Sequence, residues 1–268
     1  MRYRETQTFG TTLSSLKRFL LNPEVRPLWG NGDEAQLLAA YERVWNRKTI
    51  VRQLYETWYE KIAPELQQGS IIEVGAGTGN FKRWLKARGR ACWTLDILPG
   101  KYVDVQADAL QMPLAAGSVD NIVMVDALHH FARPLAFLKH AAEVLRPGGR
   151  LLLIEPFVSI WGRFVYRYLH HERVDFSFEE SIASKEAWDG NAAIPALTLA
   201  RVEREVRNLR IRHMSYCEFL AYPLSGGFSY HSLLPGPVLL ALHRLEQSHL
   251  FQNRTLSLRV IAVLEKTA

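Results

Sequence analysis

A glycine-rich turn and three carboxylates are the residues of this chain whose types and spacing could do chemistry. The turn contains Gly75, Ala76, Gly77, Gly79 and Asn80, and it lies between an apolar strand-like segment and a stretch with helical spacing. Glu73 lies two residues before it, and Asp96 and Asp108 follow at the ends of later strand-like segments. Because glycine carries no Cβ, the backbone can approach a ligand closely there. The spacing therefore predicts a nucleoside-binding turn at the carboxyl end of a strand.

The order of the glycines favours one cofactor class over another. A dinucleotide site requires G-x-G-x-x-G, but position 80 is Asn and the third glycine comes one residue early, at Gly79. Glu73 should repel a pyrophosphate and favour a cationic ligand. S-adenosylmethionine carries an ammonium and a sulfonium group and no phosphate, so the charge pattern predicts it ahead of a nicotinamide dinucleotide.

At these residues the sequence resembles the class I S-adenosylmethionine-dependent methyltransferases of the type 11-like kind, whose first motif is an acidic residue followed by G-x-G-x-G. The resemblance implies S-adenosyl-L-methionine as cofactor, with Asp96 accepting from both ribose hydroxyls and Ile97 beside it. It also implies that Asp108 accepts from the adenine amine and that the Ala109 amide reaches a ring nitrogen. Two longer motifs match in order, MPLAAGSVDNIVMVDALHHF from 112 to 131 and LRPGGRLLLIEP from 145 to 156. Asp126 is expected to contact the cofactor.

Histidines follow the fourth strand-like segment and again a later helical one. Methyl transfer from a sulfonium is an in-line displacement, and it needs a base only if the acceptor carries a proton. His129 and His130 are candidates for that base or for the wall of the site, and His171 belongs to a second cluster, HHE, at 170–172. Adjacent histidines point apart on a helix, and neither the other histidines nor the two cysteines have partners at metal-ligand spacing, so no metal site is predicted.

Alternating strand and helix patterns must position these residues. They predict an α/β fold, a Rossmann-like doubly wound sheet of seven strands, parallel where strands and helices alternate through 150–156, with helices on both faces. Residues 1–66 should form an N-terminal helical cap that closes over the site or covers the sheet. Residues 67–268 should form the methyltransferase core, with a mostly helical insertion at about 157–205 after the fifth strand. The strand-like segments are 71–74, 90–97, 101–108, 119–128, 150–156, 209–215 and 257–264, and helices are expected at 134–145 and 237–250.

The absence of certain motifs limits the classes of acceptor that the sequence favours. The segment after the fourth strand lacks the Asn/Asp-Pro-Pro-aromatic motif of nucleic-acid amino methyltransferases, and no cysteine follows a proline. These absences argue against nucleic acid and favour a small-molecule or lipid-like acceptor, methylated on oxygen slightly ahead of carbon or nitrogen. The apolar positions from Phe157 to Val165 lie on one helical face with Arg163 off it. Such a helix could roof the acceptor pocket, lie on an anionic membrane surface, or face the core.

Composition sets the remaining bounds. The chain has 268 residues, a net charge of +6 and two cysteines, and it lacks an apolar run long enough to span a bilayer. We expect a cytoplasmic protein, with the inner face of a membrane as the alternative location. A nicotinamide oxidoreductase, a cofactor-binding module without catalysis and a peripheral membrane scaffold remain as alternative functions, and the oligomeric state is not readable.

Overall fold

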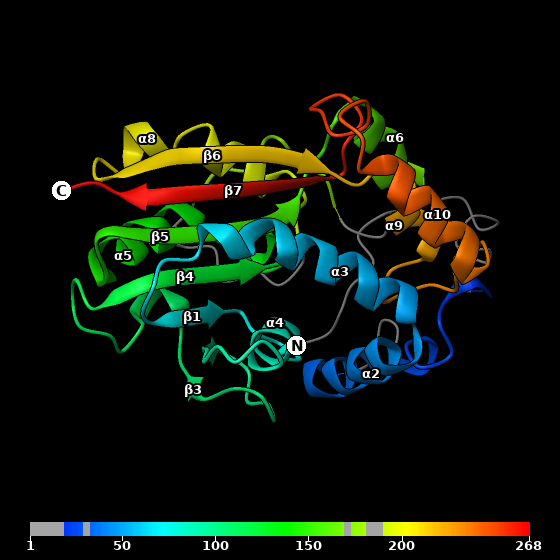
Figure 1. Ribbon diagram of the computed structural model, residues 1–268, viewed down its shortest axis with the longest axis horizontal. Helices are drawn as coiled ribbons and strands as arrows, with labels where there is room; N and C mark the ends of the chain where they lie inside the picture. The colour runs from blue at the N-terminus through cyan, green and yellow to red at the C-terminus, as the bar shows by residue number, and fades with distance from the viewer. Residues whose placement is uncertain (1–18, 29–32, 169–172, 181–189) are drawn as a thin grey trace.

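Seven strands form one sheet in the order β3-β2-β1-β4-β5-β7-β6 in the computed structural model, which describes residues 19–28, 33–168, 173–180 and 190–268. The strands are β1 (Ile71–Val74), β2 (Trp93–Asp96), β3 (Val105–Gln106), β4 (Val119–Val125), β5 (Leu145–Pro156), β6 (Leu209–Cys217) and β7 (Arg259–Lys266). The first five pair in parallel, so their carboxyl ends meet at one edge of the sheet (Figure 1). The α/β class and the seven-stranded sheet are confirmed.

The last strand in the chain runs against its two neighbours. β7 lies between β5 and β6 and runs antiparallel to both. The sequence could not reveal this, because a continuous apolar run such as SLRVIAVL fills a buried strand equally well in either direction.

Helices cover both faces of the sheet, which gives three layers (Figure 1). The α-helices are α2 (Glu34–Arg47), α3 (Thr49–Ile62), α4 (Asn80–Lys86), α5 (Pro134–Val144), α6 (Ile160–Tyr168), α7 (Ile194–Leu199), α8 (Val202–Glu205), α9 (Ala221–Ser225) and α10 (Gly236–Glu246). Short 3-10 helices are η1 (Arg26–Leu28), η2 (Ala63–Glu65), η3 (Ala109–Gln111) and η4 (Leu128–His130). Outside these, the described residues of the segment after β5 are irregular at 173–180, so that region is less helical than predicted.

The two sheet faces divide the core, because successive strand residues point to opposite sides. Ile122 and Met124 of β4 pack with α5, α7 and α8, whereas Val123 packs with α3, α4, α9 and α10. The same alternation separates the residues of β5 and β7. Helix α3 therefore belongs to the core of the sheet, and it brings six fully or nearly fully buried side chains to it, namely Val51, Leu54, Tyr55, Trp58, Tyr59 and Ile62.

The two N-terminal helices have different positions relative to the site. Asp33 caps α2 by accepting a hydrogen bond from the Gln36 amide at 2.8 Å. Helix α2 then lies beside the glycine turn, since a Cβ built on Gly77 would lie 3.5 Å from the Leu38 side chain. The two expectations for this segment therefore apply to different helices: α3 covers the sheet and α2 borders the turn.

None of the described helices is both long and apolar enough to cross a membrane.

Candidate cofactor and acceptor site

The glycine turn joins β1 to α4 at the carboxyl edge of the sheet, and its three glycines all have a left-handed φ, so none can be replaced without strain. Gly75 and Gly79 adopt left-handed φ values of 70° and 63°. A Cβ on Gly75 would lie 2.5 Å from the Ala127 Cβ, and one on Gly79 would lie 2.4 Å from the Tyr102 Cβ. Both glycines are therefore required by backbone conformation and by the close approach of neighbouring segments.

Asp96 lies against the same turn, at the end of β2. One of its carboxylate oxygens accepts from the Gly77 amide at 2.8 Å, and the other accepts from the Leu98 amide at 2.9 Å. A carboxylate offers about four acceptor sites, so both oxygens keep capacity for further donors. Asp96 is thus fixed by the backbone and still able to accept from two ribose hydroxyls.

The other residues expected on the cofactor side lie along the ends of the neighbouring strands. Ile97 is 45% exposed directly after β2. The Ala107 amide donates to the Asp96 carbonyl at 3.0 Å, which brings the end of β3 to Asp96. Asp108 is exposed and accepts from the Leu110 amide at 2.8 Å, and Ala109 begins η3. These residues therefore lie at the ends of two adjacent strands, and their contacts with ribose and adenine stay predictions.

Asn80 and Ala76 occupy the ends of the turn. Asn80 is the first residue of α4, and its side-chain oxygen accepts from Arg83, one turn later. Ala76 is 7% exposed. The turn therefore presents backbone rather than long side chains toward the edge of the sheet.

Glu73 lies beneath the first turn of α4, and its role toward the cofactor stays a prediction. Its side chain is 3% exposed and accepts from the Lys82 amide in the first turn of α4 at 3.2 Å. Burial raises the pKa of Glu73 to about 8, so the carboxyl is mostly protonated at neutral pH. Residue order alone does not show that this side chain turns under α4. The fixed carboxylate at the turn is Asp96.

Asp126 follows β4, with a left-handed φ of 52°. Its carboxylate is held by the Arg259 guanidinium, with one contact at 3.1 Å, and by the Tyr55 hydroxyl. Burial alone would raise the pKa of Asp126, but the charge and hydrogen bonds of Arg259 outweigh it and hold the pKa below its usual range. Asp126 is thus an ionised anchor for Arg259, and its contact with the cofactor stays a prediction.

The two histidines after β4 have different surroundings. His129 is 2% exposed, and its Nδ1 lies 2.8 Å from a carboxylate oxygen of the buried Glu155. The other oxygen of Glu155 accepts from the amides of Ala127 and Leu128 at 2.9 and 2.8 Å. His130 is partly exposed, with its ring 4.1 Å from that of His129 between centroids. Glu155 therefore fixes η4 and His129, and His130 is the more exposed member of the pair. His171 lies outside the described residues.

Sequence reasoning missed Glu155, Arg259 and Tyr55. The signal that could have found the first two is a single charged residue in an otherwise apolar strand, in LLLIEP and in SLRVIAVL. Such a charge is costly to bury unless it has a partner. No comparable signal marks Tyr55, which appears as one of several aromatic residues on the face of α3.

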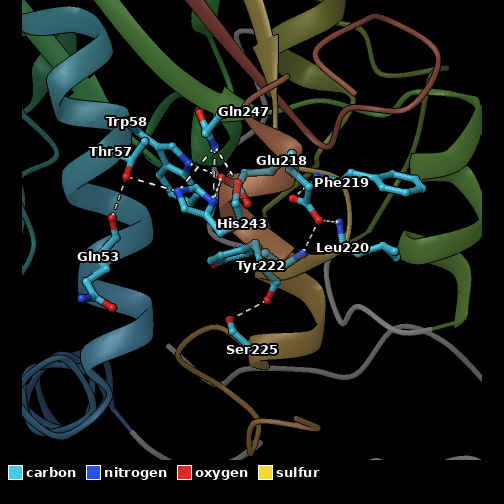
Figure 2. A network of polar contacts seen from close by, with 12 residues as sticks. Gln53, Thr57, Trp58, Glu218, Phe219, Leu220, Tyr222, Ser225, His243 and Gln247 are labelled. Carbon is cyan, nitrogen blue, oxygen red and sulfur yellow. Dashed lines mark hydrogen bonds and ion pairs between the residues drawn. The ribbon is translucent and has the colours of Figure 1, made fainter. Parts of the chain in front are cut away.

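A further buried polar group joins α3 to α9 and α10. Glu218, His243 and Glu246 bring ligand atoms within 4.8 Å of one another, so the structure gives His243 a neighbour that sequence spacing did not reveal. Glu246 accepts from three amides at 219–221, at 2.8 to 3.0 Å, and Glu218 accepts from the Trp58 indole at 2.8 Å (Figure 2). These contacts hold α10 against α3, and we interpret the group as a structural network.

The sheet order, the left-handed glycine turn and the acid at the end of β2 together define a class I S-adenosylmethionine-dependent methyltransferase. The chain belongs to the methyltransferase domain family, whose sequence model matches residues 47–209, more than half of its length. Its cofactor is S-adenosylmethionine, which supplies an electrophilic methyl group on a sulfonium when bound. Asp96 and the turn fit this cofactor, since Asp96 keeps acceptor capacity for hydroxyl groups and the turn departs from the G-x-G-x-x-G spacing of a pyrophosphate site.

Similar proteins cover part of the chain. This chain is 31% identical over 117 residues to a demethylmenaquinone methyltransferase of Tropheryma whipplei, and the match covers 37% of this chain and 48% of that protein. It is 29% identical over 140 residues to the enzyme of that name from Corynebacterium glutamicum, covering 48% and 56%. The chain thus spans about half the length of these curated relatives.

Solved structures show the same fold at low identity. A methyltransferase of Thermotoga maritima that depends on S-adenosylmethionine aligns with a TM-score of 0.54 and 14% identity, covering 88% of this chain and all of the other. One from Archaeoglobus fulgidus aligns with a TM-score of 0.50 and 14% identity, covering 81% and 94%.

Proposed function

We propose that this methyltransferase acts on a small-molecule or lipid-like acceptor. The observation that supports the proposal is an aromatic cluster at the carboxyl end of β4. The Tyr55 ring lies 5.6 Å from that of Phe228 and 6.3 Å from that of Tyr222 between centroids, and its hydroxyl bonds Asp126. Because the donor occupies the ends of β1 to β3, an acceptor in this fold lies beside the end of β4.

The cluster is part of the core beside this edge, with Tyr55 5% exposed, and aromatic surroundings of this kind suit an organic molecule better than a polyanion. Nucleic acid is bound mainly by basic side chains that contact phosphates. Here the basic group beside Tyr55 is Arg259, which is 4% exposed and already paired with Asp126. The name of the curated relatives, demethylmenaquinone methyltransferase, also points to an organic acceptor. Because the chain covers only about half of each relative, the relatives' name supports the class of acceptor proposed here and not a particular molecule.

Oxygen is the acceptor atom we favour, with His130 as base. As the acceptor oxygen forms its bond to the methyl carbon and the carbon–sulfur bond breaks, the hydroxyl proton passes to the His130 imidazole. His129 and Glu155 position the segment that carries His130, since Glu155 binds both the His129 ring and two amides of η4. A general base of this type contributes roughly 10²- to 10⁴-fold to the rate.

Labelling a cell extract tests the acceptor class. The purified protein is incubated with extract and methyl-labelled S-adenosylmethionine, and the extract is then separated into lipid, small polar molecules, nucleic acid and protein. We expect the label in the lipid or the small-molecule fraction. Label in nucleic acid or protein, above a reaction without enzyme, would contradict the proposal.

Replacing His130 tests its role once an acceptor is in hand. His130→Gln should lower kcat by roughly 100-fold or more while S-adenosylhomocysteine affinity stays within about twofold of wild type. His213→Gln, at an exposed position on β6, is the matched control and should keep full activity. Undiminished kcat in His130→Gln would exclude it as the base.

A further inference from the structure

Helix α10 has an apolar face that the described chain does not cover. Its inner face, which includes Leu239, is buried against the core. About 100–120° around the helix from Leu239, Val238 is 49% exposed and Leu245 is 66% exposed. A helix that is apolar on both sides is ordinarily covered on both sides. The outer side of α10 is therefore suited to contact something other than water.

Apolar side chains of α6 and of the segment after α10 extend this face. Ile160 and Phe164 of α6 are 73% and 49% exposed, and Leu250 is 73% exposed. The two regions are connected, because the Trp161 amide donates to the Thr255 carbonyl at 3.1 Å. Figure 1 shows α6, α10 and the loop at 247–258 at the same end of the molecule. We call Ile160, Phe164, Val238, Leu245 and Leu250 the outer apolar surface.

The charge around this surface is of one sign. Segments 157–168 and 231–258 contain one acidic residue, Glu246, and that carboxylate is buried and bonded to backbone amides. Arg163, Arg244 and Arg254 are exposed in the same segments. An apolar surface whose own segments carry exposed bases and no exposed acid matches the interface of an anionic bilayer.

We propose that the outer apolar surface docks this protein on an anionic lipid bilayer. A second copy of the chain is the less suitable occupant, because a two-fold contact would place this basic surface against itself. The outer apolar surface also lies near the carboxyl edge of the sheet, since α6 begins four residues after the carboxyl end of β5. That end lies two strands from β1, about 10 Å across the sheet. Docking would therefore hold the edge of the sheet where methyl transfer is proposed near the lipid. This consequence rests on the proposed function, whereas the docking proposal does not depend on it.

Vesicle sedimentation with the full chain tests the proposal. We expect binding to phosphatidylcholine vesicles containing phosphatidylglycerol, weaker binding to phosphatidylcholine alone, and loss of the difference at high salt. The double variant Leu245→Ser, Leu250→Ser should lower partitioning onto the anionic vesicles at least tenfold. Trp93→Ser removes a side chain that is 62% exposed at the start of β2, away from this surface, and it should bind as wild type does.

Further readouts make each outcome decisive. Arg244→Glu leaves the apolar side chains in place and should weaken binding to anionic vesicles only. Absence of vesicle binding by wild type, equal loss in the Trp93 variant, or dimerisation in solution that Leu245→Ser abolishes would overturn the proposal. Binding of S-adenosylhomocysteine, measured on the same variants, should not change. If the labelling experiment finds no lipid or small-molecule acceptor while vesicle binding persists, the proposed function fails and the docking surface stands.

Discussion

The donor side and the acceptor side of this site are built in different ways. On the donor side, backbone from consecutive segments forms the turn, and Asp96 is oriented by two amides while keeping acceptor capacity. On the acceptor side, side chains from α3, β4 and β7 satisfy one another, as in the group formed by Tyr55, Asp126 and Arg259. The donor side is thus a preformed ligand site. The acceptor side is a buried charged network whose integrity supports the fold.

The largest effect should come from breaking the charged network by removing Asp126. Asp126→Ala leaves the guanidinium of Arg259, 4% exposed, without its ionic partner, and should lower the free energy of unfolding by about 3–5 kcal/mol. Arg259→Leu should cost less, because the Asp126 side chain is 23% exposed and keeps the Tyr55 hydroxyl. Urea denaturation of both single variants and of the double variant measures the coupling. Equal losses below about 1 kcal/mol would show that the pair acts as a surface salt bridge.

Glu73 sharpens the comparison, since it is a buried acid on the donor side without a basic partner in hydrogen-bond contact among the described residues. Burial raises its pKa from 4.5 to about 8, so the folded protein binds this proton more tightly than the unfolded chain does. Its contribution to stability is therefore complete below pH 4.5 and is lost as the pH rises toward about 8. Glu73→Gln should remove that loss, on the order of 2–4 kcal/mol at alkaline pH.

Urea denaturation between pH 5 and pH 8.5, in about half-unit steps, measures this difference. The exposed Glu60→Gln is the matched control and should follow the wild-type curve. Comparing Glu73→Gln with wild type also separates Glu73 from Glu246, whose pKa burial raises as well. Parallel curves for wild type and Glu73→Gln would show that Glu73 is ionised in the folded protein.

Asp96 tests the claim that the donor side is held ready for its ligand. Asp96→Ala should weaken S-adenosylhomocysteine binding by about 1–3 kcal/mol, because the ribose hydroxyls and the Gly77 amide lose an acceptor. Asp96→Asn keeps one acceptor oxygen and should lie between Asp96→Ala and wild type. Calorimetric titration gives the affinities, and unaltered affinity in Asp96→Ala would exclude the ribose role.

The donor side could be predicted from sequence because its contacts are local. A strand, three glycines and an acid at the next strand end specify their own arrangement, and Asp96 lies where its spacing placed it. Glu73 was placed correctly in the chain, but its charge state depends on burial beneath α4, which no spacing reports. The acceptor side depends on contacts such as Tyr55 with Asp126 and Arg259 with Asp126, between segments far apart in sequence. Those partners become neighbours only after the sheet has formed. A sequence pattern can therefore identify a charged residue in a buried strand, but it cannot identify the residue that pairs with it.

The smallest effect should come from the contact between α2 and the donor side. The Tyr102 hydroxyl donates to Glu42 of α2 at 3.2 Å, and the Tyr102 Cβ lies where Gly79 must have no side chain. Tyr102→Phe keeps the ring and removes one hydrogen bond, so stability should fall by about 0.5–1 kcal/mol. If α2 retains the cofactor, S-adenosylhomocysteine should also dissociate faster by a factor of about two to five, measured by stopped-flow fluorescence. Glu42→Gln, which keeps an acceptor, should stay close to wild type. A stability loss with an unchanged dissociation rate would mean that α2 supports the turn without covering the ligand.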